Sequence, residues 1–412
     1  MRAITFAAPI PRYLATLAAG KVNERLFIGS HACTRFQSIA PPELPAATWV
    51  RIRTRLGGIC GSDLSLVTLT TTPSLSPFSS HPFVIGHESV GDIVETGSSV
   101  SGFGVGQRVV VNPLLCCEPR EVSPVCDACA TGQHQRCTHF TDGTLPPGLL
   151  IGTTRGVGGS WSEEFVAHAG QLLAIPEQMS DAEAVLIEPL ACSVHAVRSN
   201  MPRSGERILV IGAGSIGLLT VAALHALAPD VEIAVLARHE FQGDHALMLG
   251  ATRVIATRGD YAELLARAAG ARLLKPIIGE RIAVGGFDRV YVCIGSSRGV
   301  QDALRFTRSG GSVMLLGNAG SLSGVDWSPL WFKELTLGGA LCYGTHERHN
   351  HQHGGAPIHA FREASEMIAN GSAPIAALVT HRFPLSDYRR AITVALDKGS
   401  ARSVKVAFDF TR

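Results

Sequence analysis

The pattern of hydrophobic and polar positions divides the chain into two parts with different periods. Up to about residue 170, short runs alternate between apolar and polar residues, as in residues 49–56 and 107–112, with frequent glycine and proline between them. This alternation is typical of half-buried β-strands. Residues 68–80 are dominated by Thr, Ser and Pro, which predicts an irregular surface loop. The first part is therefore predicted to be β-rich.

Beyond residue 180, apolar strand-like runs alternate with helix-like runs. Ser180 and Glu183 have capping-box spacing, and we expect the helix they start to end near Glu188, because Pro189 disfavours an α conformation in the residue before it. Strand-like runs follow at residues 208–211, 231–237, 253–256, 289–294, 312–316 and 335–338. The alternation predicts a parallel, doubly wound sheet that binds its ligand at the carboxyl ends of the strands.

The last stretch predicts a helix at residues 385–398 and a strand at residues 404–410. Neither has an evident place in the parallel sheet. We therefore expect both to pack on the first part of the chain.

A glycine motif joins the first strand of the second part to the helix that follows it. A G-x-G-x-x-G pattern alone is weak evidence, but here it follows an apolar strand and opens a helix-like run, which is the context it requires. The first glycine would allow a tight turn, the second would let the backbone approach a pyrophosphate, and the third would let helix and strand pack closely. A glycine-rich core without a ligand is the alternative. The predicted cofactor-binding residues of the motif are Gly212, Gly214, Ser215, Ile216 and Gly217.

Length and composition limit the classes of protein. With 412 residues, 46% of them hydrophobic and 17% charged, the chain is expected to form two globular domains. A net charge of +2 gives no reason to expect nucleic acid or a membrane as a partner. Residues 208–228 carry no charge and could span a bilayer, but the glycines argue against that interpretation. Pro9 and Pro11 interrupt the N-terminal run, which indicates a first strand rather than a signal peptide, and the ten cysteines then indicate thiols or metal ligands in a cytoplasmic protein.

Three separate residues are candidate ligands of a catalytic metal. Cys60 follows a strand, His87 follows a loop, and Glu188 stands at the expected end of a helix. A thiolate, an imidazole and a carboxylate suit a zinc ion that keeps one position open for water or substrate. Each residue alone would be unremarkable, so the hypothesis rests on the combination.

A second group of cysteines has the spacing of a closed zinc site. Cys126 and Cys129 form a C-x-x-C pair, Cys137 follows, and Cys116 and Cys117 precede them. Four thiolates would complete a structural site. Ordinary free thiols are the alternative, although clustered cysteines would be prone to oxidation.

Four motifs in this order resemble the zinc-dependent medium-chain dehydrogenase family, in its branch of polyol, threonine and secondary-alcohol dehydrogenases. They are Cys60-Gly-Ser62-Asp63, Gly86-His87-Glu88, Glu188-Pro189-Leu190 and the glycine motif. The resemblance covers nearly the whole chain. It implies an α/β fold with a β-rich GroES-like catalytic domain at residues 1–189 and 343–412 and a Rossmann cofactor domain at residues 190–342.

The resemblance also implies roles for individual residues. Cys60 and His87 would bind the catalytic zinc, and Glu88 and Glu188 would share the remaining protein position, directly or through bound water. Ser62 would pass the alcohol proton outward. Relatives often have a histidine where this chain has Ser65, so the final proton acceptor stays open.

By the same resemblance, the structural zinc ligands would be Cys117, Cys126, Cys129 and Cys137. This chain departs from the family at residues 118–125, an insertion where the family normally has two residues. The insertion leaves the first ligand open between Cys116 and Cys117. Cys117 is preferred because it follows a strand-like run and falls where the family places its first cysteine.

The end of the second strand predicts which dinucleotide is used. An NAD-binding site generally has an acidic residue there, whereas a nearby arginine accommodates the 2′-phosphate of NADP. Ala237 occupies the expected place of the acid and Arg238 follows it. Glu240 lies close enough to weaken this interpretation, and a solvated surface arginine is the alternative. The sequence predicts a preference for NADP over NAD.

The predicted function is zinc-dependent hydride transfer between a secondary alcohol, polyol or sugar and NADP(H) or NAD(H), by a homodimer or homotetramer. Two alternatives stay open: a zinc-independent quinone or enone reductase on the same fold, and a non-catalytic dinucleotide-binding redox sensor. Trp161, Phe165 and residues 344–355 are expected to shape the substrate pocket, but the sequence does not identify the substrate. A tract with His346, His349, His351 and His353 is expected to be a solvated loop, with adventitious metal binding as the alternative.

Overall fold

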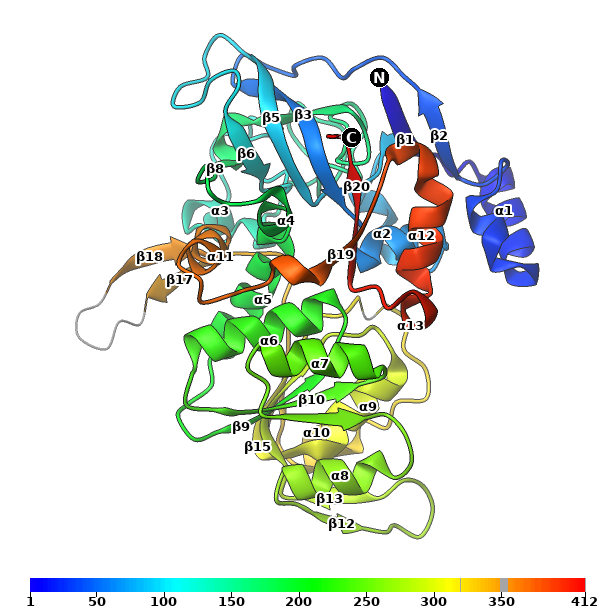
Figure 1. Ribbon diagram of the computed structural model, residues 1–412, viewed down its shortest axis with the longest axis vertical. Helices are drawn as coiled ribbons and strands as arrows, with labels where there is room; N and C mark the ends of the chain where they lie inside the picture. Colours follow the sequence, from blue (N-terminus) through cyan, green and yellow to red (C-terminus); the bar gives the residue numbers. More distant parts are fainter. Residues whose placement is uncertain (319, 349–354, 412) are drawn as a thin grey trace. The chain divides into compact units, whose positions relative to one another are not determined.

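The computed structural model describes residues 1–318, 320–348 and 355–411 (Figure 1). The chain forms two compact units, the first from Met1–Glu188 and Val379–Arg412 and the second from Pro189–Leu378. Residues 343–378 belong to the second unit, whereas the expected domain ranges placed them with the first. Within the second unit, Arg198 Nε donates to Glu363 Oε2 at 3.1 Å, which ties this stretch to the first helix of that unit.

The first unit is β-rich, as predicted. Its main sheet has the strand order β19-β20-β3-β5-β6-β8, with β7 also paired to β3, and a smaller sheet has the order β2-β1-β4. The strands are β1 (Arg2–Phe6), β2 (Thr34–Ser38), β3 (Trp49–Gly58), β4 (Phe83–Val84), β5 (Ser89–Thr96), β6 (Arg108–Val111), β7 (Glu164–His168), β8 (Leu172–Ala174), β19 (Val379–Phe383) and β20 (Lys405–Asp409). The C-terminal strand β20 pairs with β3, so the end of the chain joins this sheet as expected.

Two helices of this region differ from the sequence prediction. Helix α1 was not predicted, because Pro9 and Pro11 suggested a break. Proline is tolerated at the start of a helix, where its missing N–H would have no partner.

The prediction of a single helix that ends near Glu188 is also wrong. Helix α4 ends at Ala184, and α5 (Ile187–Ser199) then begins with Pro189 in its first turn. The helices of the first unit are α1 (Ile10–Val22), α2 (Gly61–Val67), α3 (Asp127–Ala130), α4 (Asp181–Ala184), α12 (Tyr388–Leu396) and α13 (Lys398–Ala401).

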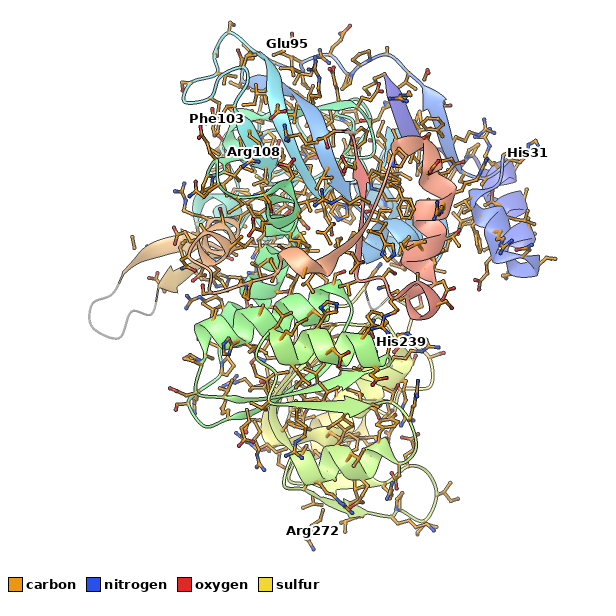
Figure 2. All side chains as sticks on the ribbon, in the orientation of Figure 1. His31, Glu95, Phe103, Arg108, His239 and Arg272 are labelled. Carbon is orange, nitrogen blue, oxygen red and sulfur yellow. The ribbon has the colours of Figure 1, made fainter. Side chains whose placement is uncertain are left out.

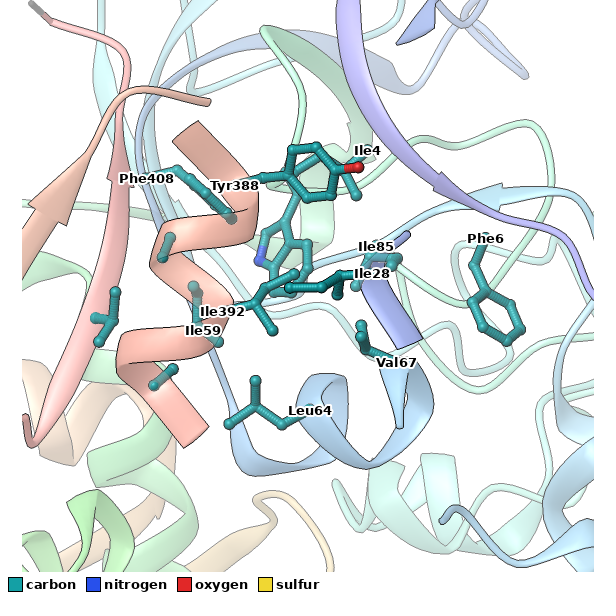
Figure 3. Close-up of a cluster of buried hydrophobic side chains, with 14 of the residues drawn as sticks. Ile4, Phe6, Ile28, Ile59, Leu64, Val67, Ile85, Tyr388, Ile392 and Phe408 are labelled. Carbon is teal, nitrogen blue, oxygen red and sulfur yellow. The ribbon is translucent and has the colours of Figure 1, made fainter. Parts of the chain in front are cut away.

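Buried apolar side chains hold the first unit together. Figure 3 shows part of one core, in which Leu64 of α2 and Ile392 of α12 belong to the same cluster. Arg108 on β6, labelled in Figure 2, donates to Asp181 of α4 at 3.0 Å and fixes that short helix to the sheet. Trp161 and Phe165 are 0% and 1% exposed and pack in two cores of this unit, so the expectation that they shape a substrate pocket is wrong.

The second unit contains the predicted doubly wound sheet. All its pairings are parallel, and the strand order is β11-β10-β9-β14-β15-β16. The chain adds β10 and β11 on one side of β9 and returns to add β14, β15 and β16 on the other, so the order reverses beside β9. Ligands bind at such a reversal, outside the carboxyl ends of the strands. The strands are β9 (Arg207–Ile211), β10 (Glu232–Ala237), β11 (Arg253–Ala256), β14 (Phe287–Val292), β15 (Thr307–Leu315) and β16 (Thr336–Gly339).

Helices and two hairpins complete the second unit. The hairpins are β12 (Arg272–Leu274) with β13 (Ile282–Val284) and β17 (Thr345–Arg348) with β18 (Gly355–His359). The helices, besides most of α5, are α6 (Ser215–Leu227), α7 (Glu240–Met248), α8 (Tyr261–Ala268), α9 (Ser297–Phe306), α10 (Ser328–Phe332) and α11 (Ala360–Ala369). Among the described residues, none of the helices is long and apolar enough to cross a membrane, and residues 208–228 divide into β9 and α6.

Candidate active site

Cys60, His87 and Glu88 converge although two separate segments supply them. Their ligand atoms lie within 4.8 Å of one another. The sheet explains this proximity, because β3 and β5 pair antiparallel and Gly57 near the end of β3 lies opposite Ser89 at the start of β5. The residues just beyond β3 and just before β5 therefore meet at the same end of these two strands. A thiolate, an imidazole and a carboxylate form a donor set that fits zinc.

Asp63 organises two members of this group. One of its carboxylate oxygens accepts from the backbone N–H of Cys60 at 2.9 Å, and the other lies 3.2 Å from Nδ1 of His87. Burial lowers the pKa of His87, but Asp63 and Cys60 outweigh that effect and raise the pKa well above its ordinary value. With Nδ1 on a carboxylate, the ring presents Nε2 as the nitrogen suited to a metal. No role for Asp63 was predicted from the sequence, although its place three residues after Cys60 is the spacing of a capping box.

Glu88 forms a buried ion pair that the sequence did not indicate. Lys405 on β20 donates to both carboxylate oxygens of Glu88, at 2.5 and 2.6 Å, and to the carbonyl of Ile59 at 3.3 Å. The exposed fractions of the Lys405 and Glu88 side chains are 2% and 0%. Gly58 makes room for the carboxylate, because a Cβ there would lie 2.0 Å from Glu88 Oε2. A metal at Cys60 and His87 would compete with Lys405 for Glu88.

Glu188 and Ser62 do not join this group of ligand atoms. Glu188 is buried in the first turn of α5 and is not among the described residues whose ligand atoms gather with Cys60. Burial lowers the pKa of Lys405, while the charges of Glu88, Cys60 and Glu188 raise it, so Glu188 lies within electrostatic reach of the pair. Ser62 is exposed on α2, and the Ser65 hydroxyl donates to the carbonyl of Gly61 at 3.1 Å.

The cysteine cluster brings together the four residues named from the sequence. Cys117, Cys126, Cys129 and Cys137 have ligand atoms within 4.8 Å of one another, and this set does not include Cys116. The Sγ atom of Cys137 lies 3.6 Å from that of Cys117 and 3.9 Å from that of Cys126. Zinc–sulfur bonds of about 2.3 Å in a tetrahedron require sulfur atoms about 3.8 Å apart. The cluster therefore fits a closed tetrathiolate site.

Backbone N–H groups donate to sulfur atoms in this cluster. Cys117 Sγ accepts from the N–H of Cys126 at 3.4 Å, and Cys137 Sγ accepts from that of His139 at 3.3 Å. Burial raises the pKa of Cys126, but backbone hydrogen bonds from Thr138 and Cys129 outweigh it and lower the pKa to about 5. Outside the set, burial raises the pKa of the Cys116 thiol to about 11.

The glycine motif has the geometry expected of a dinucleotide cradle. Gly212 directly follows β9 and has a φ of +95°, a conformation that favours glycine. A Cβ on Gly217 would lie 1.8 Å from the carbonyl oxygen of Gly212, so only glycine lets α6 approach the strand this closely. Gly214 is the N-cap of α6 and has no side chain to cover the free N–H groups of the helix. These features fit a pyrophosphate at the helix N-terminus.

The residues after β10 stand where a dinucleotide ribose is expected. Ala237 ends the strand and Arg238 is exposed beside it. His239, labelled in Figure 2, is the N-cap of α7, and Glu240 is the first residue of that helix. Glu240 therefore lies beyond the end of the strand, which makes it a poorer candidate for contact with the ribose.

Only one histidine of the expected loop tract is described. His346 lies on β17, and its Nε2 is 2.7 Å from Nδ1 of His195 on α5. His346 is thus part of a packed contact rather than a solvated loop. His349, His351 and His353 lie outside the described residues.

Comparisons with known proteins agree with this geometry. Residues 46–177 match the family model described as an alcohol dehydrogenase GroES-like domain, and residues 215–353 match that of a zinc-binding dehydrogenase. The chain is 27% identical over 366 residues to sorbitol dehydrogenase of Arabidopsis thaliana, covering 87% of this chain and 88% of that protein. It is 27% identical over 363 residues to L-idonate 5-dehydrogenase of Vitis vinifera, covering 87% of each.

Solved structures show the same fold. The crystal structure of 2R,3R-butanediol dehydrogenase from Bacillus subtilis has a TM-score of 0.69 and 23% identity, covering 91% of this chain and 96% of that one. The first family model covers Cys60, His87 and Glu88, and the second begins at Ser215, within the glycine motif. The chain belongs to the zinc-dependent medium-chain dehydrogenase family.

Proposed function

We propose that this chain is a zinc-dependent dehydrogenase that oxidises a secondary alcohol or polyol and passes a hydride to a nicotinamide dinucleotide, with NADP preferred to NAD. The observation that carries the proposal is the convergence of Cys60, His87 and Glu88 where β3 ends and β5 begins in the first unit's sheet. A zinc-independent reductase would have no use for this donor set, and the curated relatives named above act on polyols and sugar acids.

Each residue has a defined part in the proposal. Zinc would supply a Lewis acid that lowers the pKa of the alcohol, and the nicotinamide would supply the hydride acceptor. Cys60 and His87 hold the metal, Asp63 orients His87, and the exposed Ser62 on α2 passes the alcohol proton toward water. Glu88 and Glu188 remain the candidates for the third protein position, and the Lys405 pair favours Glu188, alone or through water.

The two units have different roles in this proposal. The first, Met1–Glu188 with Val379–Arg412, is the catalytic unit, and its tetrathiolate site at Cys117, Cys126, Cys129 and Cys137 is structural. The second, Pro189–Leu378, binds the dinucleotide through Gly212, Gly214, Ser215, Ile216 and Gly217, with Arg238 at the 2′-phosphate.

We infer that two copies associate through the open edge of the second unit's sheet. Strand β16 ends that sheet, and the side chains of Trp331 and Phe332 in the preceding helix are 74% and 64% exposed. An unpaired edge strand and exposed aromatic side chains are both typical of surfaces that a second subunit covers. Light scattering should give the mass of a dimer or tetramer, and Trp331→Asp should shift it to a smaller species; a monomeric wild type would contradict the inference.

A substrate screen tests the proposed reaction. Sorbitol, L-idonate, 2,3-butanediol, xylitol and L-threonine are each supplied with NADP⁺ or NAD⁺, and the reduced nicotinamide is followed by its absorbance. We expect turnover of at least one polyol or secondary alcohol, and none by Cys60→Ala under the same conditions. Reduction of quinones or enones by the Cys60→Ala variant at the wild-type rate would favour the zinc-independent alternative instead.

A further inference from the structure

The insertion at residues 118–125 carries an arginine buried in the cysteine lobe. Arg120 is 0% exposed, and all five of its N–H groups donate to backbone carbonyls. The acceptors, at 2.8, 2.9, 3.1, 3.1 and 2.5 Å, are the carbonyl oxygens of Leu115, Asp142, Leu145, Pro146 and Gly148. The hydrogen-bonding capacity of the guanidinium is thus complete.

The positive charge of Arg120, unlike its hydrogen bonds, has no carboxylate partner. In the described part of the chain, no Asp or Glu oxygen lies within ion-pair distance of its side chain, and the Asp142 contact uses the backbone carbonyl. A cation buried without a counter-charge is costly, even when its hydrogen bonds are satisfied. Some other negative group must offset it.

The cysteine cluster supplies negative charge in the same lobe. Burial lowers the pKa of Arg120, and the charges of Cys137, Asp142 and Cys116 act in the opposite direction. Asp142 is exposed, so water already solvates its carboxylate, whereas Cys117 and Cys137 are 0% and 6% exposed. Four thiolates around a divalent ion carry a net charge of −2, which is also costly to bury without a counter-charge.

We propose that Arg120 is the internal counter-cation of the metal held by Cys117, Cys126, Cys129 and Cys137. The proposal rests on the structural site assigned above. Arg120 does not touch the metal; it is a positioning residue whose charge offsets the negative charge of the occupied site and slows metal loss. Its carbonyl contacts also fix residues 142–148 around the cluster. The insertion is then a part of the site that stabilises its charge, rather than a disruption of it.

Zinc release tests the role of the charge separately from that of the hydrogen bonds. All proteins carry Cys60→Ala, so that only the cysteine site holds zinc, and transfer to a chromogenic chelator is timed. Arg120→Met removes the charge and the donors, Arg120→Lys keeps the charge but loses most donors, and Arg136→Met removes the exposed arginine beside Cys137 as a matched control.

We expect Arg120→Met to release zinc at least roughly tenfold faster, because partners around metal ligands contribute about that much affinity. Arg120→Lys should stay within about threefold of the parent despite a lower melting temperature, since it keeps the charge. Arg136→Met should match the parent. Equal acceleration in the Met and Lys variants, or none in Arg120→Met, would overturn the proposal. If Arg120→Met does not fold, Arg120→Lys is compared with the parent alone. Zinc release within about threefold of the parent would support the proposal, and faster release would overturn it.

A further variant separates this proposal from the site on which it rests. Cys129→Ser in the same background should lose its zinc. Retention of zinc there would overturn the cysteine site itself, and the counter-cation with it. Loss of zinc there, combined with normal release from Arg120→Met, would overturn the counter-cation alone.

Discussion

The Lys405–Glu88 pair makes a quantitative prediction, because both side chains are buried, with exposed fractions of 2% and 0%. Lys405 gives two of its donors to Glu88 and one to the Ile59 carbonyl. Replacing Lys405 with Met leaves the Glu88 carboxylate buried without its partner. Removal of one member of a buried pair costs about 3–5 kcal/mol in the free energy of unfolding. The double variant Lys405→Met/Glu88→Gln should recover part of that loss, because no charge is left uncompensated.

Denaturant unfolding of the metal-free proteins measures the effect, with Lys398→Met as the control. Lys398 lies in the same C-terminal stretch and is half-buried, and we expect its loss to cost under about 1 kcal/mol. Zinc adds a second readout. In zinc-loaded Lys405→Met, the freed Glu88 can serve as a metal ligand, so zinc should restore more stability to this variant than to the wild type.

Two results would refute this reasoning. A cost below about 1 kcal/mol for Lys405→Met, with no recovery in the double variant, would mean that the pair is not coupled. Equal stabilisation of wild type and Lys405→Met by zinc would mean that Glu88 does not face the metal.

Three further predictions concern the cofactor, the proton path and stability. Arg238→Ala should raise the KM for NADP on the order of ten- to a hundredfold and leave that for NAD little changed; a variant that still prefers NADP would disprove the assignment. Ser62→Ala should slow alcohol oxidation more at neutral than at high pH, where alkoxide forms more readily, while Ser65→Ala should have little effect; a pH-independent loss would leave Ser62 only a packing role. Burial lowers the pKa of Lys333 from 10.5 to about 8, so the unfolded chain binds the extra proton between these values and stability should rise as pH increases through that window. Lys333→Met should remove this rise from the pH dependence of the melting temperature, and an unchanged profile would refute it.

Local signals made much of the fold predictable. All six strands of the parallel sheet were expected from their apolar runs, because a strand covered on both faces has a continuous hydrophobic sequence. The glycine motif predicted its own geometry, since a positive φ at Gly212 and the close approach at Gly217 both require glycine. Helix α5 was misjudged because the rule against α conformation before proline does not hold in a first turn, where the missing N–H of Pro189 has no cost.

Charge pairs between distant segments could not be predicted in the same way. Lys405 stands on the last strand and reaches Glu88 only because β20 pairs with β3, which pairs with β5. The apolar residues around Lys405 do not indicate which carboxylate it pairs with. Arg120 likewise appeared only as part of an insertion, and Trp161 was expected in a pocket because aromatic residues suit both pockets and cores. Sequence patterns indicate which residues can bind a metal, whereas tertiary pairing decides what surrounds them.

The most direct test of the central claim is turnover by His87→Ala on the best substrate from the screen, relative to wild type at saturating dinucleotide. If Cys60 and His87 hold the catalytic zinc, the rate should fall more than about a hundredfold, because loss of a ligand costs at least as much as loss of the groups around it. Binding of NADPH, which the second unit is proposed to provide, should be unchanged. A His87→Ala enzyme that keeps its wild-type rate would contradict the account.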